Sequence, residues 1–279
     1  MRRGINIRKK KKIIMNEINS KTLKTILFLV ILLIFCFILY LFFFKDISMQ
    51  KNLEKESINF SGLNQNTPFI IKEIILFSSA TAESDSVNQQ LSLDISQYCD
   101  IGIYLNKIED ENIIISSLYI DNIVISSPEI GMPYLYKKKI SDLGKCSFNE
   151  DSIIKDTFQF NIVNTDKDLN YNNYEVYNNG STPISLGFYN KNIKTGFFPD
   201  NSEIFYNGSL LRDASILLSS INCNISFTIN ITTNSNEHYI CNINIDIPFE
   251  DDENNSIYKS GYITKEFDNT ETNKFIRIK

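Results

Sequence analysis

The chain has 279 residues, 43% of them hydrophobic and 22% charged, and a formal net charge of -5. This composition is typical of a globular protein and excludes an intrinsically disordered one. The charge divides into two opposite blocks, because residues 1–24 hold nine basic and one acidic side chain, whereas residues 25–279 hold 19 basic and 32 acidic ones. So acidic a segment argues strongly against nucleic acid as its partner.

Residues 25–44 (TILFLVILLIFCFILYLFFF) form an apolar run without charge, proline or glycine. As a helix, a run of this length spans about 30 Å, the thickness of a bilayer core. Basic flanks are retained in the cytoplasm, so we expect a cytoplasmic N-terminus and an extracellular C-terminus in a single-pass cell-membrane protein. A cleaved signal peptide is the alternative. Its apolar region is shorter and ends in small residues, whereas Lys45 and Asp46 follow this run.

The predicted organisation has four parts along the chain. Residues 1–24 form a basic cytoplasmic tail, 25–44 the transmembrane helix, 45–66 a stalk and 67–279 an extracytoplasmic β region. From residue 67 onward, short runs of Ile, Val, Phe, Tyr and Thr alternate with clusters of Asn, Asp and Ser, which is typical of strands and turns. The predicted fold class is therefore mainly β, an antiparallel β-sandwich of jelly-roll-like or immunoglobulin-like type.

The expected strands follow one another along the β region without a sustained helical stripe. They span residues 69–80, 91–95, 101–105, 113–125, 157–163, 184–189, 204–206, 225–232, 242–247 and 275–278. In the strand expected at 113–125, the alternation of apolar and polar residues slips near Ser116 and Ser117, which predicts a bulge or corner there. Five of the six prolines fall at strand ends or between strands, as a residue without an N–H requires: Pro128, Pro133, Pro183, Pro199 and Pro248.

The clearest local pattern is a hairpin formed by residues 225–232 and 242–247. Alternation places Ile225, Phe227, Ile229 and Ile231 on one face of the first strand and polar residues on the other. The second strand alternates in the same way, and the polar cluster 233–237 supplies the turn.

A weak internal similarity links two parts of the β region. Residues 99–106 and 223–230 share an apolar pattern that begins with cysteine, and each stretch precedes a polar turn and a second Ile-rich strand. Either two β units, 67–150 and 157–279, arose by duplication, or one sandwich uses the same hairpin pattern twice.

Catalysis is not expected from this sequence. His238 is the single histidine and stands at a strand start beside a turn, where a structural role is favoured, and no G-x-S-x-G, S-x-x-K or H-E-x-x-H pattern occurs. We therefore predict no enzyme activity, no catalytic or metal residues and no cofactor. A hydrolase that uses two carboxylates stays open, because such a pair leaves no local pattern.

Calcium ligation has one partial pattern. Residues 166–170 begin as D-x-D-x-N, but Tyr171 and Tyr177 stand where an EF-hand loop needs Gly and Glu. The acidic turns 109–111 and 250–253 could donate oxygens, although solvated loops are the favoured interpretation. The Tyr-rich segment 171–180 is either a contact loop or a loop whose rings cover the sandwich.

Cysteine usage leaves two interpretations. Cys36 falls in the predicted membrane helix, which leaves Cys99, Cys146, Cys223 and Cys241 outside, where they can form disulfides. Cys99 and Cys223 begin apolar strands, so buried thiols are an equal alternative. In the predicted hairpin, Cys223 and Cys241 are out of register for a direct cross-strand bond.

These observations predict a membrane-anchored surface protein whose acidic β-sandwich serves binding or display. Enrichment in Ile, Asn and Lys indicates an A+T-rich genome and favours a bacterial source. The expected partners are the lipid bilayer, through residues 25–44, and an extracellular protein or glycan, but no nucleic acid. The alternatives are a self-assembling envelope or fibre subunit and a carboxylate-dependent envelope hydrolase.

Overall fold

The structure is a computed structural model that describes residues 67–87, 90–107, 113–200, 203–247, 256–268 and 274–278. The predicted tail, transmembrane helix and stalk lie outside these residues. A search of the described ranges finds no helix that is long and apolar enough to cross a bilayer.

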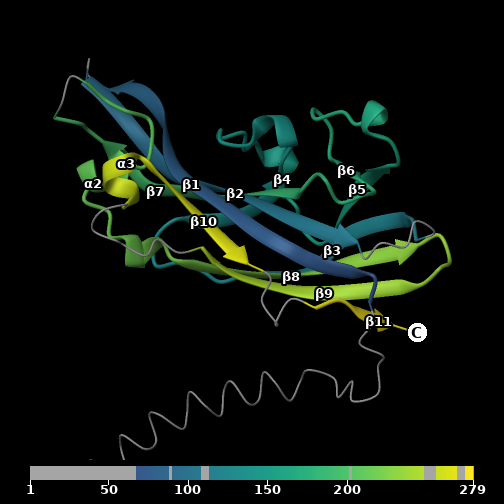
Figure 1. Ribbon diagram of the computed structural model, residues 1–279. Coiled ribbons are helices and arrows are strands. Elements are labelled where there is room, and N and C mark those ends of the chain that lie inside the picture. The colour runs from purple at the N-terminus through teal and green to yellow at the C-terminus, as the bar shows by residue number, and fades with distance from the viewer. Residues whose placement is uncertain are drawn as a thin grey trace, which may run out of the picture. The chain divides into compact units, whose positions relative to one another are not determined.

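Two β-sheets pack face to face as a sandwich (Figure 1), which confirms the mainly β prediction. Sheet A has the order β10-β1-β2-β7-β4 and sheet B the order β11-β9-β8-β3-β5-β6. The strands are β1 (Phe69–Val87), β2 (Gln90–Lys107), β3 (Ile115–Ile125), β4 (Met132–Lys137), β5 (Phe158–Val163), β6 (Glu175–Tyr177), β7 (Ile184–Phe197), β8 (Cys223–Thr233), β9 (His238–Ile247), β10 (Tyr262–Asp268) and β11 (Ile276–Ile278).

Helical segments in the described chain are short. They are the 3-10 turns η1 (Ile140–Asp142), η2 (Glu150–Ser152), η3 (Asp166–Asp168) and η4 (Leu218–Ile221) and the helices α2 (Ser209–Asp213) and α3 (Ile257–Ser260). All sheet pairings are antiparallel except that of β5 with β6, which is parallel. Sheet B is therefore mixed, and each sheet combines strands from residues 67–150 with strands from residues 157–279.

The predicted hairpin is confirmed as β8 and β9. Phe227 pairs with Ile243, and both point into the core between the sheets. The turn closes with the Thr233 N–H donating to the Glu237 carbonyl at 3.0 Å, and Asn236 adopts a φ of 60°. Asparagine tolerates this left-handed conformation better than most residues do, which explains a turn without glycine.

The expectation of separate strands at 91–95 and 101–105 was wrong, because residues 90–107 form the single strand β2. Strand β2 lies between β1 and β7 and is buried on both faces. Its polar groups find partners there: Ser96 Oγ accepts a hydrogen bond from the Asn192 N–H at 3.0 Å.

Other strand predictions had mixed outcomes. The bulge in β3 is confirmed, since its register against β8 shifts between Ile115 and Ser117 and again between Asp121 and Val124. The strand expected at 204–206 is absent, because these residues form the loop that leads into α2. Strands β4, β6 and β10 were not predicted. Pro133 falls within β4, an edge strand of sheet A, where a missing N–H can face away from the neighbour.

The outer face of sheet A is covered and forms a second buried region. The segment after β4, residues 138–157 with η1 and η2, lies over this face above β4 in Figure 1, and Ile153 forms a bridge with Tyr136. Beneath it, Tyr98, Tyr136 and Tyr189 form a cluster apart from the main core, joined by the partly buried Phe77 and Phe148. We call residues 138–157 the cap.

Candidate functional site

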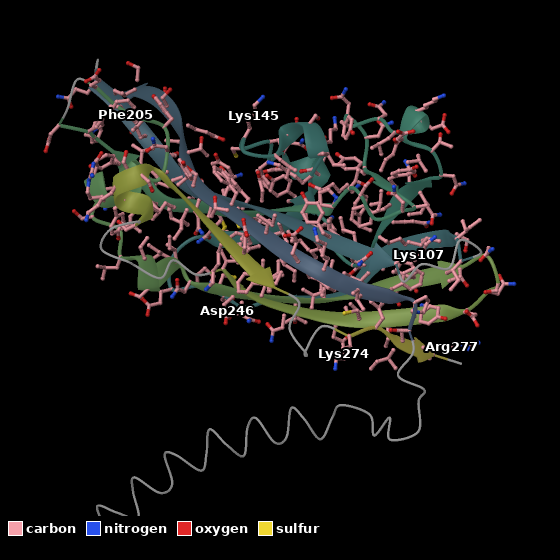
Figure 2. All side chains as sticks on the ribbon, in the orientation of Figure 1. Lys107, Lys145, Phe205, Asp246, Lys274 and Arg277 are labelled. Atoms are coloured by element: carbon pink, nitrogen blue, oxygen red, sulfur yellow. The ribbon has the colours of Figure 1, made fainter. Side chains whose placement is uncertain are left out.

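The outer face of sheet B carries a polar array that faces away from the core. Alternation on β8 and β9 buries the apolar residues and places amides, hydroxyls and a carboxylate on the opposite face. Asn242, Asn244 and Asp246 on β9 are exposed. In Figure 2, Asp246 and the cap residue Lys145 lie on opposite sides of the sandwich. We call this surface the β8–β9 polar face.

Hydrogen bonds between strands hold the side chains of this face in place. The Asn224 amide donates to Asn244 Oδ1 at 2.6 Å and to Asp246 Oδ1 at 2.7 Å. One step along the sheet, Thr228 Oγ1 donates to Asn242 Oδ1 at 3.0 Å. An asparagine that accepts through its oxygen retains two N–H donors, so the array offers ordered donors and acceptors to a ligand.

Strand β3 extends the array. The Asn230 amide donates to Asp121 Oδ1 at 2.8 Å, and His238 Nε2 lies 3.2 Å from Asn230 Oδ1. Asn230 is buried although it lies on the outer face, which shows that its neighbours pack closely around it. His238 begins β9 beside the turn, as predicted, and its ring contacts an amide rather than a nucleophile.

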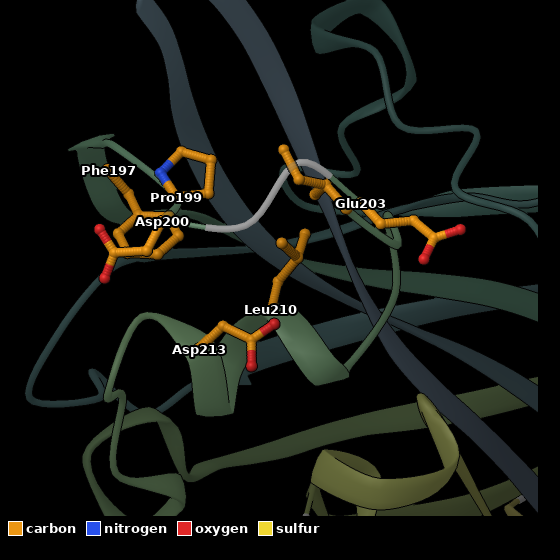
Figure 3. A pocket seen from close by; sticks show the side chains of 7 residues that line it. Phe197, Pro199, Asp200, Glu203, Leu210 and Asp213 are labelled. Carbon is orange, nitrogen blue, oxygen red and sulfur yellow. The ribbon is translucent and has the colours of Figure 1, made fainter.

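A small pocket lies at the end of the sandwich near α2 (Figure 3). Its volume is about 170 Å³, and it is lined by Phe197, Pro199, Asp200, Glu203, Ile204, Leu210 and Asp213. The carboxylates of Asp200 and Glu203 point away from each other in Figure 3, and Asp213 pairs with Arg212 at 2.9 Å. Ligand pockets usually exceed about 300 Å³, so both size and orientation make this pocket a poor site for a carboxylate-pair hydrolase.

A buried ion pair lies beneath the cap, and the sequence analysis did not identify it. Lys138 Nζ lies 2.7 Å from Asp100 Oδ1, and the two side chains are 0% and 3% exposed. The contact lacks hydrogen-bond geometry at Oδ1. The ammonium also donates to the Lys145 carbonyl and, at 3.4 Å, to the Tyr136 hydroxyl. Burial raises the pKa of the Asp100 carboxyl, and Lys138 opposes that rise.

One signal could have revealed this pair. Asp100 is the one charged residue between Ile95 and Leu105, and a charge in a strand buried on both faces requires a partner. Lys138 gave no comparable signal, because it is the middle residue of three consecutive lysines that read as a solvated segment.

The four cysteines that the structure describes are all free thiols. Cys99, Cys223 and Cys241 are buried and Cys146 is exposed. Cys223 pairs with Ile247 and Cys241 with Ile229, so the two cysteines of the hairpin are out of register, as predicted. Burial raises the pKa of the Cys241 thiol to about 12, which makes it a poor nucleophile.

The residues of the partial calcium pattern lie in an exposed turn. Asp166 and Asp168 belong to the exposed turn η3, where Asp168 accepts a hydrogen bond from the Thr165 hydroxyl at 2.5 Å. Across the described ranges, no group of three or more His, Cys, Asp or Glu residues could hold a metal ion. The acidic turns 109–111 and 250–253 fall outside those ranges.

The Tyr-rich segment 171–180 contributes both to the surface and to the core. Tyr171 is 53% exposed, whereas Tyr174 packs edge-on against Phe158 with ring centroids 5.4 Å apart. The interpretation of a loop whose rings cover the sandwich therefore holds for Tyr174, and Tyr171 is left at the surface.

Comparison with known proteins yields no relative from which a function could be transferred. No family model, no curated protein and no solved structure matches the chain. Any functional argument must therefore rest on its own residues.

Proposed function

We propose that this chain is a single-pass bacterial surface protein that displays a glycan-binding β-sandwich outside the membrane. In this proposal, residues 1–24 lie in the cytoplasm, residues 25–44 cross the bilayer and residues 45–66 form a stalk. The opposite charges of the two flanks support this orientation, because basic residues are retained inside. The sandwich would then be of the jelly-roll-like or immunoglobulin-like kind that recurs in surface proteins.

The observation that carries the binding role is the β8–β9 polar face. The amides of Asn242 and Asn244 and the carboxylate of Asp246 are exposed on β9. Hydrogen bonds from Asn224 and Thr228 on β8 orient them. A site that is ordered before binding loses little entropy when a ligand arrives.

The chemistry of this face favours a hydroxyl-rich ligand over a protein. Protein interfaces are built around buried aromatic and apolar residues, whereas Asn242, Asn244 and Asp246 present amide and carboxylate groups. Such groups match the donors and acceptors of sugar hydroxyls. A glycan of the cell envelope or of a host surface is therefore the proposed ligand class.

A glycan array probed with the full-length chain in detergent tests this proposal. The double variant Asn244→Ala and Asp246→Ala should bind any sugar hit about 30-fold more weakly, since two lost hydrogen bonds at about 1 kcal/mol each cost about 2 kcal/mol. Asn172→Ala, which removes an exposed amide from the loop before β6, is the matched control and should bind normally. Absence of any sugar binding, or equal binding by the double variant, would refute the assignment of this face.

Self-assembly through strand edges is the second candidate. Strand β10 is the longest edge strand in the described chain and leaves one row of backbone groups without a strand partner. It also carries charged residues such as Lys265 and Glu266, which natural proteins use to discourage edge pairing. A hydrodynamic radius that grows with protein concentration would favour assembly over ligand display.

A further inference from the structure

The buried pair beneath the cap has a specific origin in the register of sheet A. Asp100 on β2 pairs with Gly187 on β7, and Gly187 in turn pairs with Tyr136 on β4. Because Gly187 has no side chain, the Tyr136 ring lies over it; a Cβ there would fall 2.2 Å from Tyr136 Cζ. Lys138, two residues beyond Tyr136, reaches back over the same strand to Asp100.

The surroundings of the pair exclude water. Tyr98, Tyr136 and Tyr189 form its buried aromatic neighbourhood, and Phe148 stacks on Tyr189 with ring centroids 4.1 Å apart. The cap closes the site from above, where the Gly144 N–H donates to Asp100 Oδ2 at 2.5 Å. Two opposite charges removed from water in this way lose solvation that their attraction restores only in part.

We propose that Lys138 and Asp100 react with each other to form an intramolecular amide bond that joins β2 to the cap. One proton passes from the ammonium to the carboxylate, which leaves an amine and a carboxylic acid. The amine lone pair then attacks Asp100 Cγ, the N–C bond forms, and the bond from Cγ to one carboxyl oxygen breaks. That oxygen leaves as water with one proton from the acid and one from the nitrogen, so the reaction needs no oxidant, reductant or cofactor.

The contacts around the pair suit each stage of this reaction. Burial raises the pKa of the Asp100 carboxyl, which favours the uncharged acid that the attack requires. The Gly144 N–H can stabilise the negative charge that develops on Oδ2 during attack. The Tyr136 hydroxyl, 3.4 Å from Nζ, can pass a proton from the nitrogen towards the leaving oxygen.

The proximity of the lysine amine and the aspartate carboxyl group also accelerates amide formation. The strand register and the packed rings hold nucleophile and electrophile together in the folded chain, which converts a slow bimolecular condensation into an intramolecular step. Exclusion of water also opposes the reverse reaction, hydrolysis of the new amide. The β8–β9 polar face takes no part, so this inference stands independently of the proposed glycan binding.

Intact-mass measurement of the reduced full-length chain, purified in detergent, is the direct test. The wild-type chain should weigh one water molecule less than the mass set by its sequence, whereas Lys138→Arg should show its full sequence mass. Comparison of the two chains cancels any common processing of the N-terminus. Peptide mapping should then find a branched peptide that joins the segments containing Asp100 and Lys138.

The chain provides its own control. Lys191 Nζ lies 2.8 Å from Glu150 Oε1, a similar distance, but these side chains are 29% and 76% exposed. Their peptides should stay unlinked, because water keeps both groups charged. Tyr136→Phe should retain the ring and the fold, measured by circular dichroism, but accumulate the cross-link more slowly after synthesis. A wild-type chain at full sequence mass, or a cross-link at any other pair, would overturn the inference.

Discussion

Gly187→Ala should destabilise the sandwich, because the added methyl group would occupy the space of the Tyr136 ring. The new Cβ would lie 2.2 Å from Tyr136 Cζ and 2.3 Å from Cε1. Carbon atoms prefer separations of about 3.5 Å or more, so the ring would have to move by about 1.3 Å. Tyr136 is fully buried and has no free space for that movement. Overpacking of this kind costs about 1–3 kcal/mol.

Urea unfolding followed by circular dichroism measures this cost. In thermal unfolding of a β region of this size, a loss of about 2 kcal/mol corresponds to a fall of about 4–8 °C in Tm. The comparison should be made in the Lys138→Arg background as well, so that a change in cross-linking does not contribute. Combination with Tyr136→Ala should remove most of the penalty, because the overlapping atoms are then gone.

Gly102→Ala is the matched control, since Gly102 also lies inside a strand of sheet A. A Cβ at Gly102 meets only ordinary contacts, the nearest being Pro183 Cβ at 3.6 Å. This variant should stay within about 1 kcal/mol of the wild type, on the stabilising side, because alanine has less freedom than glycine in the unfolded chain. Equal unfolding midpoints for the two variants would refute the packing of Tyr136 over Gly187.

Two further predictions concern titratable groups. Of the four described cysteines, Cys146 should be alkylated first in the native chain, because its side chain is exposed, and Cys99, Cys223 and Cys241 only after unfolding, because they are buried. Burial raises the pKa of all four thiols, so exposure sets this order. Mass shifts without reductant check this, and two thiols that resist alkylation even in denaturant would contradict it. The hydrogen bond and charge of Lys191 lower the pKa of Glu150. This pair should therefore stabilise the fold fully above the ordinary glutamate pKa of about 4.3. The stabilisation should be lost as the pH falls through the lowered pKa of Glu150 in the folded chain. The stability difference between the wild type and Glu150→Gln should therefore shrink in acid; a constant difference from pH 3 to pH 7, a range of about 4 units around the glutamate value, would contradict the pairing.

Local sequence patterns correctly predicted strands that turn one face to the core and the other face to solvent. The β8 and β9 hairpin is legible because its outer residues are polar and its inner ones apolar, so both face and register follow from alternation. The same reasoning failed for β2, whose two faces are both covered. Polar residues such as Ser96 and Asp100 there indicate buried partners rather than a break in the strand.

Contacts between distant segments set the limit of sequence reasoning. The pairing of Asp100 with Lys138 depends on the order β2-β7-β4, in which β7 comes from much later in the chain. No spacing in the sequence encodes that order. The apolar residues Ile204 and Phe205 similarly read as a strand, although they lie in the loop before α2, where Phe205 is 61% exposed.

The two sheets differ in what covers their outer faces, and this difference separates the proposed binding surface from the proposed cross-link. On sheet B, Asn242, Asn244 and Asp246 of β9 reach solvent, so their hydrogen-bonding groups can exchange water for a ligand at little cost. On sheet A, the cap removes water from Asp100 and Lys138. No external ligand reaches these two side chains, so the proposed reaction takes place between the two residues themselves. The cap covers a cluster of aromatic side chains, as any covering loop would. The buried lysine and carboxylate in contact go beyond that role. They are the arrangement that the proposed cross-link between strand and cap requires, and that bond would fix the cap while the opposite face stays free for a ligand.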